Sequence, residues 1–403
     1  MNSRSKYLIM AVTLGVVLAL TLLGLLNMER VKTVQAAPLS LAADTLLVSI
    51  RATPVLSEAY KINMTHPRLA VTSTVAAIAA NPPGWTIECV DCPKYFETLT
   101  DRSLRLDSAG HPAIAYGGDH LYYAWNDGST WHLTTVDNSP RVGSYASLVL
   151  DGSNYPHISY YDTTNGDLKY AYQDVSGWHI QTVDSGGDVG SYTSLALDGN
   201  RYPHISYHDN ILDNLKYAYW NGSGWQILTP DTASGEYTSL VLDGSGYAHI
   251  SHQGIGLKYT YQNGTGWHTT LVEGITHLGM SVGTNTSLAI DGLGYAHISY
   301  GKEDNSLSIP YSLKYAYQTA SGWYSQTVDL YIYGVGSTSL ALDGSTYPHI
   351  AYNIGGASGN AEYLSYAYQD GSGWHTRLNN SNLTLAVCRR DASLCSFDGT
   401  LQA

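Results

Sequence analysis

Residues 194–229 read SLALDGNRYPHISYHDNILDNLKYAYWNGSGWQILT, and they form the best-preserved copy of a unit that recurs along the chain. The unit contains four short runs rich in β-branched and aromatic residues, SLALD, PHISY, LKYAY and WQILT, with Gly, Asp, Asn or Pro between them. These runs predict four strands, here named a to d, because such residues favour extended chain and such separators favour turns. The a–b and c–d links, which carry Asp-Gly in most copies, predict tight hairpins.

Seven copies are visible when the chain is aligned on tryptophan, with spacings of 42 to 56 residues. The aligned residues are Trp85, Trp131, Trp178, Trp225, Trp267, Trp323 and Trp374. A period of about 47 residues with four strands per unit is typical of β-propeller blades, whereas leucine-rich repeats are shorter and tetratricopeptide repeats are helical. The sequence therefore predicts an all-β fold, a seven-bladed β-propeller of four-stranded antiparallel blades over residues 54–380. In the degenerate first copy, Ser57 to Lys61 would form strand a. The alternative is six blades plus a divergent N-terminal segment.

The links between the expected strands differ in a regular way. The spacing from the Ser of strand a to the start of strand b is nine residues in six copies, and the spacing from the first Tyr of strand c to the Trp of strand d is eight. By contrast, the b–c span ranges from 10 residues (His249 to Tyr259) to 18 (His297 to Tyr315). The b–c and d–a links of an antiparallel blade emerge at the same face of the disc. We therefore expect one constant face and one variable face, with any binding site on the variable face.

Composition limits the possible partners. The 403 residues are 13% charged and 44% hydrophobic, with 34 Tyr but only 2 Phe, and the formal net charge is -13. Such an aromatic, weakly charged chain is not disordered. Its acidic balance excludes the electrostatic attraction that nucleic acids and anionic membrane surfaces require, so we expect no nucleic-acid partner.

The N-terminal segment predicts export. Arg4 and Lys6 precede an apolar run over residues 7–26, and Val34-Gln35-Ala36 offers small residues at the spacing that a signal peptidase reads. Residues 1–36 are therefore expected to be a signal peptide or, because the run is long enough to cross a bilayer, an N-terminal membrane anchor. In either case residues 37–53 form a linker, and the remainder is secreted or extracytoplasmic. This segment is the only expected contact with a membrane.

Four cysteines flank the repeats in two pairs, Cys89 with Cys92 and Cys388 with Cys395. In an oxidising compartment they are disulfide candidates with three possible connectivities, and the sequence leaves these open. A four-cysteine zinc site is the alternative, but a second C-x-x-C is missing. Our hypothesis is that the tail, residues 381–403, closes the ring with a strand at NLTLAV, and that a disulfide between the two pairs clamps it.

Recurring histidines and acidic loops raise the question of metal ions. The residues His157, His204, His249, His297 and His349 hold the same place in strand b. Equivalent positions on successive blades lie on a circle rather than around one ion, so we expect a repeated structural hydrogen bond instead of a metal site. The Asp-rich b–c loops at residues 162–167 and 209–214 leave Ca²⁺ as an alternative, although we expect no cofactor.

The blade pattern and the D-G-S-G-W hairpin at Asp370 to Trp374, with a looser form at Asp127 to Trp131, resemble tandem-repeat β-propeller proteins. These are propeller lectins and, more distantly, sialidase-like Asp-box propellers. The resemblance implies a carbohydrate ligand. The hairpin departs from the sialidase Asp-box, because the aromatic residue follows the Asp by four positions rather than five and the Ser two residues before the Asp is absent. The arginines occupy no common repeat position, so a three-arginine carboxylate clamp is not expected.

We therefore expect an exported, non-catalytic binding module whose partner is a glycan or a surface protein. Candidate ligand contacts lie where strand b ends on the variable face: Tyr161, Asp162, His208, Asp209, His252, Gln253, Lys302 and Asp304. These positions differ between blades, which favours one or two sites over one site per blade. A polysaccharide hydrolase or lyase assembled from single residues of different blades is one alternative, and a structural protein–protein scaffold is the other.

Overall fold

The computed structural model describes residues 45–49, 59–63, 90–91, 102–331, 334–355 and 362–379. The chain separates into two compact units, Met1–Asn81 and Pro82–Ala403. In the first unit, β1 (Thr45–Ser49) and β2 (Ala59–Asn63) form a two-stranded antiparallel sheet. Among the described residues there is no helix with the length and apolar character that a membrane crossing needs.

Two of the sequence predictions lie outside the described residues. The first is the export segment, residues 1–36, and the second is the ring-closing tail with its disulfide clamp. The cysteines proposed for that clamp are Cys89, Cys92, Cys388 and Cys395, and each of the four lies outside the described ranges. Their pairing, and the choice between a disulfide and a zinc site, therefore stay predictions.

Six four-stranded antiparallel sheets make up the described part of the second unit, and in each sheet the strands are hydrogen-bonded in chain order. We number them as blades 1 to 6. The first three consist of β3 (Leu104–Leu106), β4 (Pro112–Gly117), β5 (Leu121–Asn126) and β6 (Trp131–Asp137); β7 (Val142–Leu150), β8 (Pro156–Asp162), β9 (Asp167–Asp174) and β10 (Gly177–Asp184); and β11 (Val189–Leu197), β12 (Pro203–Asp209), β13 (Asn214–Trp220) and β14 (Trp225–Thr232). The last three consist of β15 (Glu236–Leu242), β16 (Ala248–Gly254), β17 (Gly256–Asn263) and β18 (Gly266–Glu273); β19 (Met280–Ile290), β20 (Ala296–Asp304), β21 (Tyr311–Thr319) and β22 (Gly322–Tyr331); and β23 (Val335–Leu342), β24 (Pro348–Gly355), β25 (Glu362–Asp370) and β26 (Gly373–Asn379).

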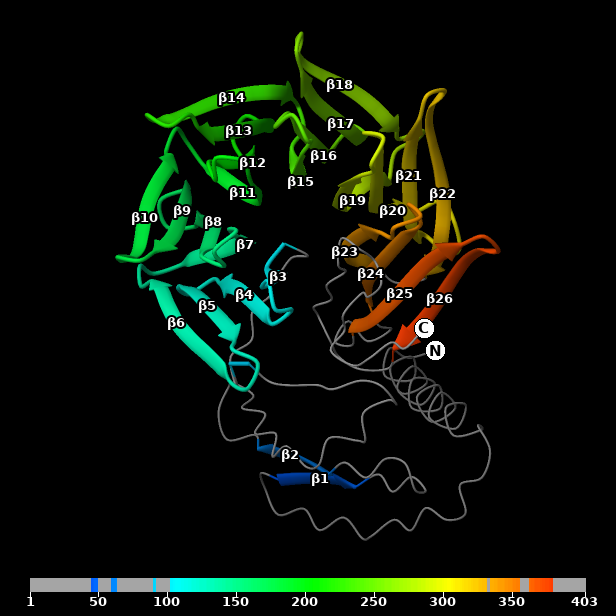
Figure 1. Ribbon diagram of the computed structural model, residues 1–403. Coiled ribbons are helices and arrows are strands. Elements are labelled where there is room, and N and C mark those ends of the chain that lie inside the picture. The colour runs from blue at the N-terminus through cyan, green and yellow to red at the C-terminus, as the bar shows by residue number, and fades with distance from the viewer. Residues whose placement is uncertain are drawn as a thin grey trace, which may run out of the picture. The chain divides into compact units, whose positions relative to one another are not determined.

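The six blades stand around a common centre, with strand a of each blade innermost and strand d outermost (Figure 1). This confirms the predicted all-β propeller architecture. The described residues hold six blades rather than the predicted seven. Strand β2, which overlaps the predicted first strand at Ser57 to Lys61, pairs with β1 and not within a four-stranded sheet. That copy shares only a His-Pro and a Gly-Trp pair with the others and lacks the LKYAY run, so too little of the blade pattern was present to define it.

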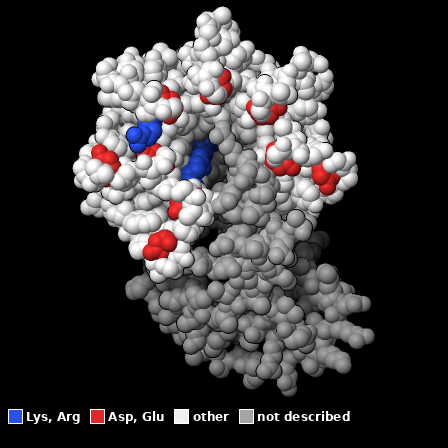
Figure 2. Space-filling view, viewed as in Figure 1, with Lys and Arg blue, Asp and Glu red and all other residues white. Residues whose placement is uncertain are grey.

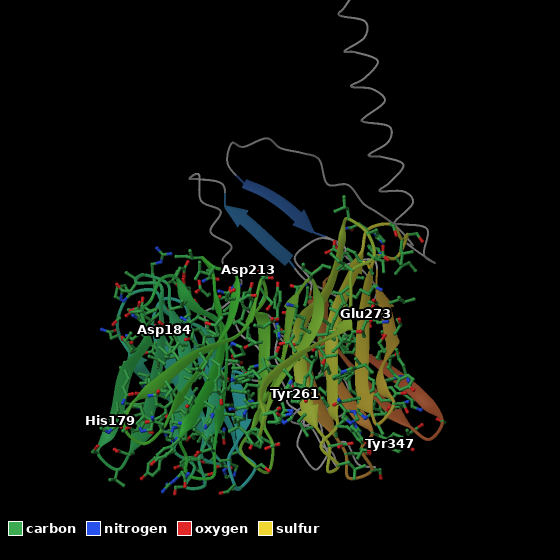
Figure 3. The ribbon with its side chains drawn as sticks, turned by 90° about the horizontal axis from the view of Figure 1, so that it is seen from above. His179, Asp184, Asp213, Tyr261, Glu273 and Tyr347 are labelled. Carbon is green, nitrogen blue, oxygen red and sulfur yellow. The ribbon has the colours of Figure 1, made fainter. Side chains whose placement is uncertain are left out.

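The two faces of the disc differ as their link lengths predicted. Figure 3 shows one face near the b–c and d–a links, where Asp184, Asp213 and Glu273 lie. The opposite face carries the a–b and c–d turns, near which Tyr347 and His179 lie. The a–b turns keep their length because an Asp carboxylate in each turn accepts two backbone N–H groups at 2.7–2.9 Å, from the residues two and four positions later. Such an Asx-type cap suits only one loop length.

The repeated histidine makes the structural hydrogen bond that we predicted. In blades 2 to 6 its Nδ1 atom lies within hydrogen-bond distance of the first Tyr hydroxyl of strand c, for example 2.5 Å between His157 and Tyr170. In blades 1 to 5 the Trp of the next blade packs edge-on against the Tyr at this position of strand c, with ring centroids 5.0–5.6 Å apart, as Trp225 does on Tyr170. The tryptophans thus anchor one blade to the next and need no ligand to explain them.

The inner strands are tied together by hydrogen bonds from their repeated serines. The Ser hydroxyl oxygen of strand a accepts the backbone N–H of a Leu in strand a of the next blade, at 3.0 Å in four successive interfaces. The pairs are Ser147 with Leu195, Ser194 with Leu240, Ser239 with Leu288, and Ser287 with Leu340. All four Leu residues are less than a tenth exposed, so these bonds satisfy buried donors.

A carboxylate near the end of strand d forms a second contact between blades, which we call the carboxylate clamp. Asp184 accepts hydrogen bonds from Tyr207 at 2.7 Å and from Lys216 at 2.5 Å, both in the next blade. The clamp carboxylates are Asp137, Asp184, Asp231, Glu273 and Asp329, and Lys from strand c of the next blade approaches the first four. In blade 6, Ser365 stands where the other blades have this Lys.

Blade 4 departs from the clamp pattern through two linked changes. His252 occupies the strand-b position that Tyr holds in neighbouring blades, and Thr260 occupies the strand-c position that Ala holds. The His252 ring is fully buried, and its Nε2 atom lies 2.8 Å from Thr260 Oγ1. The threonine hydroxyl therefore supplies a partner that the smaller alanine would not offer to this imidazole.

Candidate functional site

Three of the predicted contact residues hold the b–c loops in shape. The Asp162 carboxylate accepts the backbone N–H groups of Thr164 and Asn165 at 2.9 and 3.1 Å. Asp209 accepts the N–H groups of the corresponding two residues of its own loop at 3.0 and 2.9 Å, and Asp304 accepts that of Ser306 at 3.1 Å. These carboxylates are engaged as loop caps.

Two further candidates lie in contacts between blades. His252 is fully buried beside the clamp carboxylate Asp231, with 4.0 Å between Nε2 and Oδ2. The Lys302 ammonium group donates to Glu273 Oε1 at 3.0 Å, so it shares a clamp carboxylate with Lys314. The structure thus places both side chains in the carboxylate clamps.

The remaining three candidates extend toward the inner strands. The Tyr161 ring lies 6.4 Å from the ring of Tyr145 in β7, and the His208 ring lies 6.1 Å from that of Tyr192 in β11. Gln253 donates from Nε2 to Ser281 Oγ at 2.8 Å, in β19. The first two of these contacts involve residues that sequence reasoning did not single out, the tyrosines of strand a.

Tyr145, Tyr192 and Tyr237 form what we call the tyrosine arc. They occupy equivalent positions in the innermost strands of blades 2, 3 and 4, and their ring centroids are 4.7 Å apart for the first pair and 4.6 Å for the second. Each precedes the repeated Ser by two residues, at a β-bulge where the pairing register with strand b shifts. The arc therefore lies in the part of strand a that follows the d–a link, on the variable-face side of the inter-blade serines.

The arc tyrosines adopt an unfavourable backbone conformation. Their φ angles are 55°, 54° and 53°, in the left-handed region that β-carbons disfavour by about 1–2 kcal/mol per residue. Asn285, at the same place in blade 5, has φ 50°, and Asn tolerates this region better. In blade 6 the segment from Val335 to the repeated Ser is one residue shorter. The tyrosines are thus retained in three neighbouring blades despite a conformational cost, which points to a use of their rings.

The bulge itself has a structural role that does not require an aromatic side chain. The backbone carbonyl of Tyr192 accepts the hydroxyl of Thr238 in the next blade at 2.8 Å. The carbonyls of Tyr237 and Asn285 accept Thr286 and Thr338 in the same way, also at 2.8 Å. Because Asn285 supports the same bond, the need for the bulge does not explain why three of the four residues are Tyr.

A polar network backs the middle of the arc. The Ser191 hydroxyl donates to Asn210 Oδ1 at 2.7 Å, and the same oxygen lies 3.1 Å from His208 Nδ1. His208 Nε2 lies 3.0 Å from Asp213 Oδ1. Asn210 also donates to Asp188, which accepts the hydroxyl of Tyr161 as well. Although Ser191, His208 and Asp213 follow one another as in a hydrolase triad, the serine is 3% exposed and its proton is committed to Asn210.

The phenol groups of Tyr192 and Tyr237 are neutral. Burial, followed by the neighbouring hydroxyls and Glu236, raises the pKa of Tyr192 well above its ordinary value. Burial likewise raises the pKa of Tyr237. At physiological pH Tyr192 and Tyr237 therefore offer flat, uncharged rings with hydroxyl groups that can donate or accept hydrogen bonds.

On the constant-turn side of the tyrosine arc, the centre of the propeller holds a cavity of about 960 Å³ with both apolar and polar walls. Its walls are the parts of the inner strands that lead to the a–b turns, with side chains such as Leu197, Leu242 and Leu342. The cations among its described lining residues are Arg102 and Arg105. Figure 2 shows this hollow at the middle of the face that bears the constant turns, with basic side chains inside it and acidic ones spread over the blades. Arg102 Nη2 donates to the carbonyl of Thr286 at 2.5 Å.

Within the described ranges, no three His, Cys, Asp or Glu side chains are grouped as metal ligands would be. The two loops considered for Ca²⁺ use Asp162 and Asp209 as caps of their own backbone. No residue set in these loops identifies a cofactor.

Neither the protein-family models nor the curated proteins contain a match to this chain. Among solved structures, AofleA from Arthrobotrys oligospora is similar, with 13% identity over 72% of this chain and 89% of that chain and a TM-score of 0.48. A mutant of the NanB sialidase from Streptococcus pneumoniae has 12% identity over 69% and 68% and a TM-score of 0.43. An ulvan lyase of a polysaccharide lyase family has 13% identity over 65% and 69% and a TM-score of 0.37.

Proposed function

We propose that this protein is an exported carbohydrate-binding module that holds one glycan segment on the tyrosine arc. The observation that carries the proposal is the presence of three adjacent tyrosines in a left-handed backbone conformation at the axial end of the variable face. A tyrosine ring combines a flat apolar surface with a hydrogen-bonding edge, which suits the apolar face and the hydroxyl rim of a sugar ring. Export follows from the N-terminal segment and is proposed with it.

The arrangement supports one site rather than one per blade. The three rings touch in sequence, so a ligand that stacks on Tyr192 also contacts Tyr145 and Tyr237. Blade 5 has Asn285 at this place, and in blade 6 the segment from Val335 to the repeated Ser is one residue shorter. Because the arc spans only blades 2 to 4, we expect a stoichiometry of one glycan per chain.

The test is a glycan array followed by calorimetric titration of the best ligand. Tyr192→Asn is expected to weaken binding by about 30-fold, because central aromatic contacts contribute about 2 kcal/mol or more. Its stability is expected to change by no more than about 1 kcal/mol, since relief of the left-handed strain offsets the lost ring contacts. Asn285 shows that this bulge accepts asparagine.

Tyr324→Asn serves as the matched control, because Tyr324 is 49% exposed on the outer strand β22. It should bind as the unaltered protein does. A blank array, or equal binding by Tyr192→Asn and the control, would contradict the proposal. Release of reducing sugar from an array ligand would favour the polysaccharide-acting alternative, and capture of a defined surface protein without glycan would favour the scaffold alternative.

A further inference from the structure

Glu236 is a half-buried carboxylate in the inner strand β15. It directly precedes Tyr237, at the position where Ser144, Ser191 and Thr284 stand in the neighbouring inner strands. The clamp carboxylates Asp137, Asp184, Asp231 and Glu273 all have lysine partners. By contrast, within the residues that the structure describes, the Glu236 side chain makes neither a hydrogen bond nor an ion pair.

The negative charge of Glu236 lies beside the arc. Burial and the hydroxyls of Tyr237 and Tyr145 are the larger causes of the raised pKa of Tyr192, and Glu236 adds to them. Burial is also the largest cause of the raised pKa of Tyr237; the hydrogen bond with Tyr192 lowers that pKa, and Glu236 raises it. A carboxylate that has lost part of its hydration is unfavourable unless another group compensates its charge. The faces of the adjacent tyrosine rings carry the negative end of the aromatic quadrupole, so they do not supply that compensation.

Two further negative charges lie near the middle of the arc, and the cations outside the clamps lie toward its two ends: Arg141 at blade 2, and Arg102, which donates to the carbonyl of Thr286 in blade 5. Asp188 and Asp213 belong to the polar network behind Tyr192. Among the lysines of blades 2 to 4, Lys169, Lys216 and Lys258 are bound to clamp carboxylates and are at most 18% exposed in their side chains. Arg141 is exposed in the d–a link ahead of β7, next to the blade 2 end of the arc rather than at Glu236. A ligand on Tyr192 and Tyr237 therefore meets a negative environment.

We infer that the glycan bound by the arc carries free amino groups, and that a protonated hexosamine amine is held between Glu236 and the faces of Tyr192 and Tyr237. The inference rests on the proposed carbohydrate function and names its ligand class. Aromatic rings attract a cation by about 0.5–2 kcal/mol, and a neighbouring carboxylate adds a charge-assisted hydrogen bond to an ammonium group. The same environment disfavours uronic, sialic and sulfated sugars, because like charges repel.

The experiment compares three tetrasaccharides by calorimetric titration at about pH 6, where ordinary carboxyl groups are ionised and most amines of a glucosamine oligomer are protonated. The probes are the glucosamine tetramer, its fully N-acetylated counterpart and tetragalacturonate. We expect the free-amine tetramer to bind most tightly and tetragalacturonate not to bind. Glu236→Gln should weaken the free-amine tetramer by about tenfold, which corresponds to about 1.4 kcal/mol, and should leave the acetylated tetramer unchanged.

Glu303→Gln is the control for the loss of one negative charge from the same face. Glu303 accepts hydrogen bonds from Asn305 and Tyr311 in blade 5, outside the arc, so binding of the free-amine tetramer should not change. Equal affinity for the acetylated and free-amine tetramers, a tightest ligand without an amine, or no effect of Glu236→Gln would overturn the inference while leaving carbohydrate binding intact. Loss of all glycan binding would instead remove the proposed function itself.

Discussion

The free energy of unfolding is expected to fall by several kcal/mol as the pH is lowered from about 6.5 to about 4. The cause is the repeated histidine of strand b. Burial lowers the pKa of all five copies, and that of His157 falls to about 4. An unfolded histidine binds its proton near pH 6.5, so acid favours the unfolded chain by up to about 1.4 kcal/mol per pH unit for each residue.

The charges around these rings do not reverse the direction. At His157, Asp151 acts to raise the pKa and Arg201 to lower it, but burial dominates. The histidine contribution is therefore complete above about pH 6.5 and is lost as the pH falls toward the folded pKa. A second loss follows below about pH 4, because hydrogen bonds from Lys169 and Tyr160 outweigh burial and hold the pKa of Asp137 at about 2.

Urea unfolding followed by tryptophan fluorescence between about pH 8 and about pH 3.5 measures this dependence. His157→Gln provides the matched variant, because an amide can still hydrogen-bond to Tyr170 but does not titrate. It should be somewhat less stable at about pH 8 and should lose less stability on acidification. Unfolding midpoints that stay constant between about pH 7 and about pH 4.5 would show that the buried histidines are not the cause.

Asp184→Ala is expected to lower the free energy of unfolding by about 3–5 kcal/mol. The substitution leaves the Lys216 ammonium group, whose side chain is 13% exposed, and the fully buried Tyr207 hydroxyl without their shared acceptor. Removing one partner of a buried ion pair is costly mainly because the other charge stays behind. The double variant Asp184→Ala/Lys216→Met should therefore be more stable than Asp184→Ala alone.

Asp329→Ala tests the same argument in blade 6. The Asp329 carboxylate accepts Tyr352 at 2.9 Å and also Tyr331, and Ser365 replaces the lysine of the other clamps. Removing this carboxylate leaves no clamp lysine without its acceptor, so the free energy of unfolding should fall by a smaller amount, about 1–3 kcal/mol. If Asp184→Ala and Asp329→Ala lower the free energy of unfolding equally in urea titrations, the unpaired charge of Lys216 is not the source of the effect.

The sequence predicted the blade architecture because its evidence is local and repeated. The nine-residue spacing from Ser194 to Pro203 reflects an Asp198 turn that fits one length, and the His204–Tyr217 contact joins neighbouring strands of one blade. Six of the seven predicted copies correspond to blades in the described residues. The degenerate first copy does not, since one His-Pro pair and one Gly-Trp pair cannot specify four strands.

The site was harder to predict because its members meet across blades. Tyr145, Tyr192 and Tyr237 are 45 to 47 residues apart, and their importance lies in a backbone conformation that residue type does not reveal. The available signal was an aromatic residue two positions before the repeated Ser in three successive copies. Strand-b ends were chosen instead, and three of those eight residues, Tyr161, His208 and Gln253, do extend toward the inner strands.

The contact between His252 and Thr260 limits the exchange of one blade for another. A tandem array that grew by duplication begins with interchangeable modules, yet here a substitution in one strand is matched by a compensating substitution in the strand beside it. Restoring tyrosine at position 252 alone would bring a phenol against a threonine methyl and hydroxyl that suit an imidazole. Grafting or consensus engineering of this blade must therefore exchange positions 252 and 260 together, because each of these side chains fits the other and not the residue that neighbouring blades carry.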